Sequence, residues 1–156
     1  MEEVLKRIRV VADYQFGKGV GSELFPDNVE VSYSKRTGRI RYVHFGGRRL
    51  VTLRPTDGLF SLSIAGAKRI TKSKRSAKCV VTVQNDVSKF IAEGGDVFAA
   101  HVVKADDAIR PKDEAIVVDE DSKILAVGRA VLSGEEMKAF KTGVAVKVRR
   151  GRLEES

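Results

Sequence analysis

The side chains that usually carry catalysis are scarce in this sequence. Its 156 residues include two histidines, His44 and His101, and one cysteine, Cys79. Nucleophilic catalysis needs a nucleophile beside a base, and a zinc site needs several His or Cys ligands together. Both histidines lie in strand-like stretches, and Cys79 precedes Val80-Val81, where we expect it to be a small buried hydrophobe. We therefore expect no catalytic residue, no metal and no cofactor.

The acidic clusters and one glycine-rich segment also favour structural roles. Carboxylates in loops and at helix starts commonly serve turns and helix dipoles. Such positions hold Asp106, Asp107, Asp119, Glu120, Asp121, Glu135 and Glu136. Residues 16–21 (Phe-Gly-Lys-Gly-Val-Gly) match no phosphate loop, because no strand precedes them and no Gly-Lys-Ser/Thr closes them. We expect a turn there rather than a nucleotide site.

The cationic side chains are abundant and unevenly distributed. The net charge is +8, but residues 1–78 hold 17 Lys and Arg against 7 Asp and Glu, a net charge of +10. Residues 79–156 hold 12 against 14, a net charge of −2. This asymmetry predicts two units, the first facing a polyanion, and nucleic acid is the polyanion that clustered Lys and Arg suit best. The alternative is a solvated basic face that maintains solubility.

Much of this charge falls on a predicted antiparallel meander in the first half. An amphipathic helix is predicted over residues 2–15, followed by strands at 29–33, 40–45 and 50–53. Turns are predicted at residues 35–38 and 46–47. The arginines on these strands or turns are Arg36, Arg39, Arg41, Arg48, Arg49 and Arg54. They form a candidate phosphate-binding surface, in which Arg39 and Arg41 are expected to share a face. Alternatively, several of them merely blunt the sheet edges.

A basic run marks the predicted boundary between the two units. Ser63 is expected to cap a helix from Ile64 to about Ile70, and residues 68–78 read Lys-Arg-Ile-Thr-Lys-Ser-Lys-Arg-Ser-Ala-Lys. This run is almost free of apolar residues after Ile70. We predict a linker that also contacts RNA, with Lys72, Lys74 and Arg75 as candidate contacts. The predicted domains are residues 1–76 and 77–151, followed by a tail at 152–156.

The second half is predicted to form a small β-barrel. Asp86 is expected to cap a short helix that stops at Gly94-Gly95 and leads into an apolar strand. The two glycines could bring a phosphate or base edge close to bare backbone, or they could simply end the helix. Further strands are predicted at 79–83, 115–119, 124–132 and 144–149, and a capping box at Ser133 and Glu136 predicts a helix over 134–141.

Several longer motifs in the second half resemble the PUA domain, a module named for pseudouridine synthases and archaeosine transglycosylases. The resemblance covers residues 79–151 and rests on residues 87–98, 109–118 (Ile-Arg-Pro-x-Asp-Glu-x-x-Val-Val), 125–130, 133–140 and 143–149. Residues 1–75 resemble the domain that precedes PUA in archaeosine tRNA-guanine transglycosylase. The motifs there are residues 12–17 (Ala-Asp-Tyr-Gln-Phe-Gly), 34–41 (Ser-Lys-x-Thr-Gly-Arg-Ile-Arg) and 52–60. The expected fold class is therefore α+β, a mixed helix and antiparallel-sheet domain followed by a PUA-type pseudo-barrel.

The resemblance also implies where RNA would bind to the second unit. A PUA domain grips RNA along its first helix, the glycine loop and the following strand, with the final strand alongside. In this sequence those positions are Glu93, Gly94, Gly95, Asp96, Val97, Phe98 and Ala99, with Lys147, Arg149 and Arg150. Phe98 is more readily explained as a core residue. Glu93 and Asp96 place negative charge beside the proposed contact.

Catalysis in the transglycosylase family uses a (β/α)₈ barrel of about 250 residues and a cysteine-rich zinc site, and this sequence has room for neither. We therefore expect a non-catalytic RNA-binding protein, with tRNA as its target and a role in archaeosine-type modification as a separate subunit or accessory of a catalytic chain. The alternative is a translation-associated PUA factor on the small ribosomal subunit. A self-sufficient RNA-modifying enzyme is disfavoured. No apolar run reaches the ~20 residues of a membrane span, so we expect a cytoplasmic protein without a membrane partner.

Overall fold

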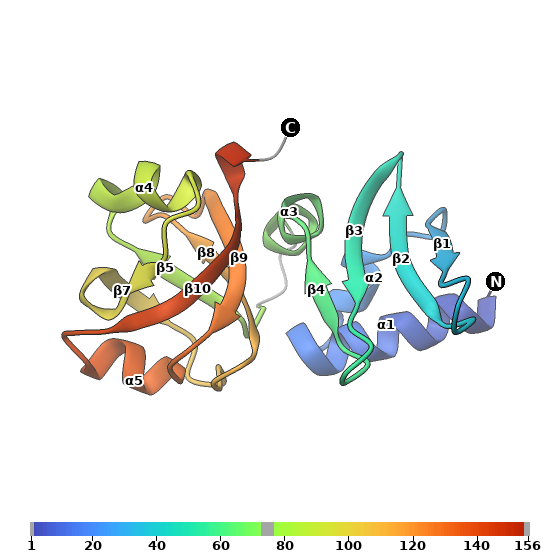
Figure 1. Ribbon diagram of the computed structural model, residues 1–156, viewed down its shortest axis with the longest axis horizontal. Helices are drawn as coiled ribbons and strands as arrows, with labels where there is room; N and C mark the ends of the chain where they lie inside the picture. The colour runs from blue at the N-terminus through green and yellow to red at the C-terminus, as the bar shows by residue number, and fades with distance from the viewer. Residues whose placement is uncertain (1, 73–76, 155–156) are drawn as a thin grey trace. The chain divides into compact units, whose positions relative to one another are not determined.

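The computed structural model describes residues 2–72 and 77–154. The chain divides into two compact units, unit 1 at Met1–Ala77 and unit 2 at Lys78–Ser156 (Figure 1). Lys74 and Arg75, two of the predicted RNA contacts, lie outside the described residues. No helix among the described residues is long and apolar enough to cross a membrane.

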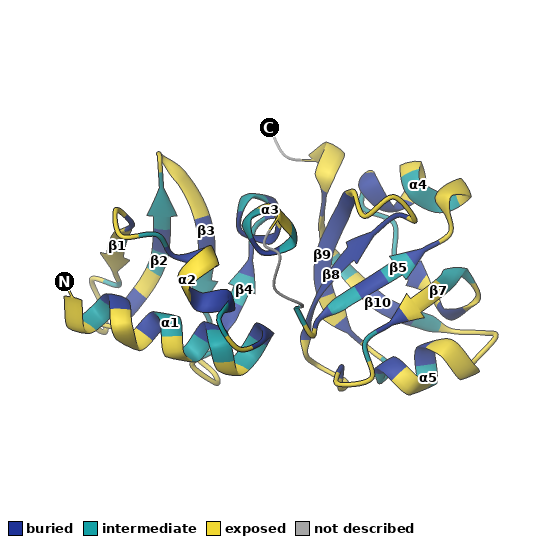
Figure 2. Cartoon of the chain, turned by 180° about the vertical axis from the view of Figure 1, so that it is seen from behind, coloured by how far each residue is buried: buried dark blue, intermediate teal, exposed yellow. Residues whose placement is uncertain are grey.

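Unit 1 is an antiparallel sheet with helices on one side. The strands are β1 (Glu30–Tyr33), β2 (Ile40–Phe45), β3 (Arg48–Leu53) and β4 (Phe60–Leu62), in the order β1-β2-β3-β4. Helices α1 (Glu2–Phe16) and α2 (Val20–Leu24) lie on the same side of this sheet (Figures 1 and 2). Leu5, Ile8, Ala12 and Phe16 recur along α1 at helical spacing and are all buried. The apolar stripe of α1 therefore supplies much of the core of unit 1.

The predicted elements of unit 1 are present, with two differences. β4 was not predicted, because three residues are too few to show alternation. α3 (Ile64–Lys72) is longer than predicted and takes in the first half of the expected basic linker. Its predicted cap is confirmed, since the Gly66 N–H donates to Ser63 Oγ over 3.0 Å.

Unit 2 contains a six-stranded sheet in the order β6-β10-β9-β8-β5-β7, curled into a partly closed barrel (Figure 1). The strands are β5 (Val80–Val83), β6 (Val97–Phe98), β7 (Val102–Ala105), β8 (Glu114–Val118), β9 (Ile124–Ala130) and β10 (Val144–Gly151). Helices α4 (Ser88–Ala92) and α5 (Gly134–Ala139) and three 3-10 turns, at residues 85–87, 99–101 and 152–154, complete the unit. β8 is buried along its whole length (Figure 2), and the expected α+β fold class is confirmed.

Several local predictions for unit 2 were wrong, and β9 also ends two residues before its predicted end, at Ala130. Asp86 does not cap α4, because a 3-10 turn intervenes and the residue before the helix, Val87, provides no side-chain cap. The expected strand after Gly95 is broken into β6 and β7 by the turn at residues 99–101, which contains His101. α5 ends two residues early, at Ala139. The capping box is confirmed, since Ser133 and Glu136 bind each other's backbone N–H groups reciprocally.

Candidate nucleic-acid interface

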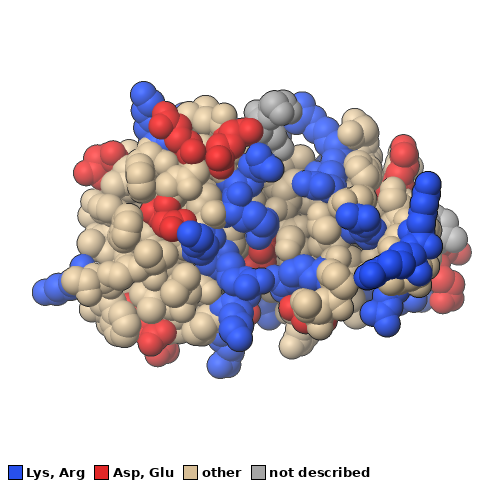
Figure 3. Space-filling model, viewed as in Figure 1, with Lys and Arg blue, Asp and Glu red and all other residues tan. Residues whose placement is uncertain are grey.

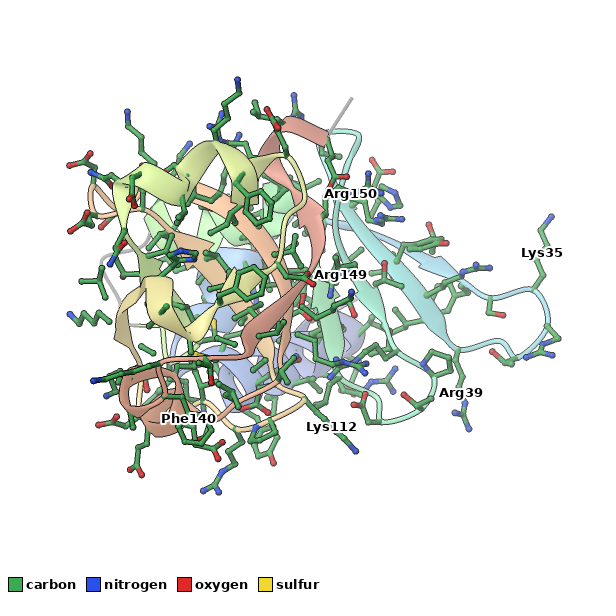
Figure 4. All side chains as sticks on the ribbon, turned by 60° about the vertical axis from the view of Figure 1, so that its left-hand side comes forward. Lys35, Arg39, Lys112, Phe140, Arg149 and Arg150 are labelled. Carbon is green, nitrogen blue, oxygen red and sulfur yellow. The ribbon has the colours of Figure 1, made fainter. Side chains whose placement is uncertain are left out.

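The turn between β1 and β2 exposes a group of cations. Ser34 and Arg39 close the turn, with the Ser34 N–H donating to the Arg39 carbonyl over 2.8 Å. Lys35 and Arg39 project outward from this end of the hairpin (Figure 4), and Arg36 is also exposed. Arg39 lies one residue before the start of β2, so its sharing a face with Arg41 stays a prediction.

Tyr42, in the middle of β2, forms cation–π contacts with two further arginines. The guanidinium carbons of Arg41 and Arg49 lie 5.0 and 5.3 Å from the centre of its ring. The edge of the His44 ring meets Tyr42 at a centroid separation of 6.0 Å. Cation–π contacts of this kind hold a guanidinium in place without neutralising its charge. Because both arginines are exposed, this cluster presents fixed positive charge to solvent.

Arg54 differs from the other arginines of the meander. Its guanidinium binds the Asp57 carboxylate through Nε at 3.2 Å and Nη2 at 3.1 Å, and its side chain is only 13% exposed. Asp57 also accepts the Leu59 N–H at 2.9 Å. Arg54 therefore stabilises the turn at residues 54–59, and its charge is already compensated.

Arg48 and Lys72, predicted on separate segments, lie together around a hollow in unit 1. This α3 hollow is lined by Glu23, Phe45, Arg48, Leu50, Ala65, Lys68, Arg69 and Lys72. Sequence reasoning did not single out Phe45, Lys68 or Arg69 as contacts, although the two cations belong to the predicted basic run. Lys and Arg side chains stand out on the surface of unit 1 in Figure 3.

The glycine bend of unit 2 is closed to the approach that the sequence suggested. Gly94 has a φ of +107°, in the left-handed region, whereas the φ of Gly95 lies outside that region. Gly94 alone therefore makes the helix-ending turn. The N–H groups of Gly94 and Gly95 already donate to the carbonyls of Ile91 and Phe90, both at 2.9 Å. A phosphate therefore finds no free backbone N–H at these two glycines.

Side chains also cover both glycines of this bend. A Cβ on Gly95 would come within 2.3 Å of the Phe90 ring, and one on Gly94 within 2.8 Å of the Glu154 carboxylate. Glu154 belongs to the final 3-10 turn, in the segment predicted as a tail, and accepts the Gly151 N–H at 2.8 Å. The helix-ending interpretation of the two glycines accounts for this geometry, and close approach of RNA to bare glycine backbone does not fit it.

The residues that flank the bend divide between core and surface. Val97 is fully buried and Ala99 is 3% exposed, so their side chains face the core. Phe98, which the sequence favoured as a core residue, is 39% exposed, and its ring meets His101 edge-on at 6.1 Å. Glu93 is exposed and lies 3.9 Å from Lys89. Phe98 is the member of the predicted loop that offers an apolar surface.

Two of the predicted cations on β10 are engaged with carboxylates. Asp96 accepts the Val148 N–H at 2.9 Å and lies 3.4 Å from Lys147 Nζ. Arg149 binds both carboxylate oxygens of Glu114, whose side chain is fully buried. Arg149 therefore compensates a buried negative charge. Arg150 is exposed beside it on β10 (Figure 4), and its side chain has no hydrogen bond or ion pair within the described residues.

Cys79, the single cysteine of the sequence, is not placed for covalent chemistry. Cys79 is buried, as predicted, and burial together with the nearby Glu114 carboxylate raises the pKa of its thiol far above the ordinary value. Such a thiol stays protonated and unreactive. Within residues 2–72 and 77–154, no group of three or more His, Cys, Asp and Glu side chains could hold a metal ion.

Comparison with known proteins assigns a domain family to each unit. Residues 6–76 match the model of patch-forming domain C2 of tRNA-guanine transglycosylase, and residues 79–152 match the PUA domain. The tRNA-guanine(15) transglycosylase of Methanobrevibacter smithii is 43% identical over 147 residues, which is 94% of this chain and 22% of the relative. That of Thermococcus kodakarensis is 45% identical over 149 residues, 96% of this chain and 25% of the relative. The chain thus spans about a quarter of the length of these curated relatives.

Solved structures share the fold across the whole chain. A hypothetical protein from Pyrococcus horikoshii superimposes with a TM-score of 0.78 at 24% identity, covering 99% of this chain and 93% of that one. A conserved PUA-domain protein from Thermoplasma acidophilum gives a TM-score of 0.69 at 22% identity, with coverages of 99% and 91%. Unit 1 thus matches the C2 domain of tRNA-guanine transglycosylase and unit 2 matches the PUA domain, and together they are similar to the C-terminal region of the tRNA-guanine(15) transglycosylases.

Proposed function

We propose that this chain is a non-catalytic RNA-binding protein that recognises tRNA. It acts as a separate subunit or accessory of a transglycosylase catalytic chain in archaeosine-type tRNA modification. Both of its domain families occur in enzymes named for tRNA modification. The scarcity of catalytic side chains makes binding, rather than chemistry, the contribution of these residues.

The observation that carries the proposal is the exposed positive charge of unit 1. Arg36, Arg39, Arg41, Arg48 and Arg49 are all exposed, and none forms an ion pair within the described residues. Uncompensated guanidinium groups bind phosphate strongly, often through two parallel hydrogen bonds. The cluster of Arg41 and Arg49 on Tyr42 also fixes two of these groups in advance, which lowers the entropy cost of binding.

Unit 2 adds a smaller contact surface. Among the residues predicted to contact RNA in this unit, the available groups are Phe98, beside the glycine bend, and Arg150 on β10, because Lys147 and Arg149 are already paired. An exposed aromatic ring suits an unpaired base or a sugar, and a single arginine suits a phosphate. In this proposal unit 2 contributes shape recognition, and unit 1 contributes most of the electrostatic attraction.

Titration of labelled tRNA with the full chain over a series of salt concentrations tests the proposal. Counterion release predicts that log affinity falls linearly with log salt, by ~0.7–0.9 for each phosphate neutralised. Salt-independent binding, or no binding, would overturn the proposal. Binding confined to small ribosomal subunits would replace the modification role with a translation role. A single-turnover modification assay on bulk tRNA with the chain alone should give no product, and product formation would contradict the non-catalytic role.

A further inference from the structure

The α3 hollow, with a volume of ≈ 320 Å³, is built from the end of the β2–β3 hairpin and one side of α3. Gly46 and Gly47 have φ angles of +58° and +77°, which is the backbone of a two-residue type I′ turn. This turn places Phe45 directly opposite Arg48 in the strand register. The hairpin therefore presents an aromatic ring and a guanidinium side by side at the edge of the hollow.

Helix α3 supplies the other wall through the spacing of its residues. Ala65, Lys68, Arg69 and Lys72 recur at intervals that place them along one side of a helix, and all four line the hollow. The buried residues of α3 are Ile64, Gly66, Ala67 and Ile70, which face the core. The helix thus separates an apolar stripe that packs into unit 1 from a basic stripe that faces the hollow.

The floor of the hollow is apolar and its rim is cationic. Phe45 and Leu50 contribute apolar surface, whereas Arg48, Lys68 and Lys72 are exposed cations with no ion pair within the described residues. Like charges four residues apart on a helix destabilise it by ~0.2–0.5 kcal/mol. The mutual repulsion of these cations therefore destabilises the folded unit slightly, and a bound anion would relieve that repulsion.

Arg69 is held in place before any ligand arrives. Its Nε donates to the carbonyls of Glu23 and Leu24 at the end of α2, over 3.0 and 3.3 Å. Its guanidinium carbon lies 4.9 Å from the centre of the Phe45 ring. The stacked pair of Arg69 and Phe45 offers a preorganised flat surface, and planar guanidinium and aromatic groups are the surfaces on which unpaired bases stack.

We infer that the α3 hollow binds one unpaired nucleotide, with its base against Phe45 and Arg69 and its phosphate among Arg48, Lys68 and Lys72. The volume is at the low end of the ~300–1,000 Å³ typical of small-ligand sites, so it has room for a single nucleotide and excludes a duplex. Glu23, the one carboxylate in the lining, offers an acceptor for an amino or hydroxyl group of the same nucleotide. The ligand is either an unpaired nucleotide of an RNA, which rests on the proposed function, or a free nucleotide.

Two RNA probes distinguish base binding from general charge attraction. A short blunt RNA duplex and the same duplex with an unpaired 3′ overhang are titrated with the full-length wild type and with Phe45→Leu. Phe45→Leu keeps an apolar side chain but removes the ring. We expect it to weaken binding of the overhang probe by about 5- to 100-fold, the range for losing one stacked base, and to leave the blunt duplex unchanged. Equal effects on the two probes would overturn the inference.

A second variant, which changes only charged side chains, tests the site even if Phe45→Leu fails to fold. Lys68→Gln with Lys72→Gln removes two exposed cations, relieves a like-charge pair and should leave the melting temperature at or above that of the wild type. Its control, Arg7→Gln with Lys18→Gln, removes the same charge from exposed residues of unit 1 outside the hollow. The hollow variant should lose more affinity for the overhang probe than the control. Equal losses would contradict the site.

Adenosine 5′-monophosphate and inorganic phosphate identify the source of the ligand by NMR titration of the full chain. One outcome is that the monophosphate shifts the amide signals of Phe45 and α3 at concentrations where phosphate alone does not. In that case the hollow is a nucleotide site, even if no RNA binds to the chain. That result would separate this inference from the proposed function. If phosphate shifts the same signals equally well, the hollow is a simple anion site and the nucleotide inference fails.

Discussion

The cations predicted to contact RNA are paired to different extents in the two units. Four cations of unit 2 bind carboxylates, two of them at predicted contact positions: Arg149 with Glu114, Lys147 with Asp96, Lys138 with Asp107 and Lys89 with Glu93. In unit 1, the described ion pairs are Arg9 with Asp27 and Arg54 with Asp57, and the arginines around Tyr42 and the hairpin turns have none. Lys147 and Arg149 therefore serve the fold in unit 2, whereas most of the predicted arginines of unit 1 remain available to a polyanion.

This difference shows that the number of cations in a segment is a poor guide to where a polyanion binds. What matters is whether each cation already has a carboxylate partner. A surface ion pair is worth only about 0–1 kcal/mol, so RNA could compete for Lys147. The pair of Arg149 with the buried Glu114 is different, because releasing Arg149 would leave an uncompensated charge in the core.

The largest expected effect is therefore on stability, at Arg149. Arg149→Met leaves the carboxylate of Glu114 buried without its cation. Breaking such a pair costs roughly 3–5 kcal/mol; because the Arg149 side chain is 40% exposed, we expect about 2 kcal/mol. Urea unfolding monitored by circular dichroism measures it. Arg41→Met, an exposed arginine of unit 1, is the control and should change the unfolding free energy by less than ~1 kcal/mol. Similar losses in both variants would remove the contrast between the units.

The next effect concerns RNA affinity. Arg41→Gln with Arg49→Gln removes the two guanidinium groups on Tyr42, and we expect tRNA binding at fixed low salt to weaken by about tenfold, equivalent to ~1.4 kcal/mol. Lys147→Gln with Arg150→Gln removes the same charge from unit 2 and should weaken binding less, because Lys147 is already engaged with Asp96. Filter binding measures both variants. If the unit 2 variant lost more affinity, unit 2 would be the principal electrostatic surface.

The smallest expected effect concerns a feature that the two units share, a serine that caps a helix. Ser63→Ala and Ser133→Ala each remove a helix-capping hydroxyl, from α3 in unit 1 and α5 in unit 2. Loss of such a cap costs ~1 kcal/mol, so thermal unfolding should shift by a few degrees in each variant while tRNA affinity stays unchanged. A loss of affinity in Ser63→Ala alone would indicate that the position of α3 matters for binding, which the α3 hollow would explain.

Local patterns predicted the fold well where the decisive residues are neighbours in sequence. The capping box at Ser133 and Glu136, the neighbouring strands β8 and β9 and the cap at Ser63 were all predicted from short motifs. The parallel pairing of β5 with β8 was not, because it joins segments more than thirty residues apart and has no local signal.

The candidate site was harder to predict for the same reason. The Gly94-Gly95 motif indicated a close approach of backbone and ligand, but the neighbours that fill that space are the Phe90 ring and, from the far end of the chain, Glu154. The compensation of Arg149 depends on Glu114, thirty-five positions earlier. Sequence could identify the cations, but only the tertiary structure reveals which of them have partners.

The salt dependence of tRNA binding, compared between the two double variants and the wild type, tests most directly whether unit 1 carries the electrostatic contact. Each phosphate contact that is lost should lower the slope of log affinity against log salt by ~0.7–0.9. We predict that Arg41→Gln with Arg49→Gln lowers the slope by one to two such steps, and that Lys147→Gln with Arg150→Gln lowers it by at most about one. An unchanged slope in the unit 1 variant, with a reduced slope in the unit 2 variant, would contradict the account.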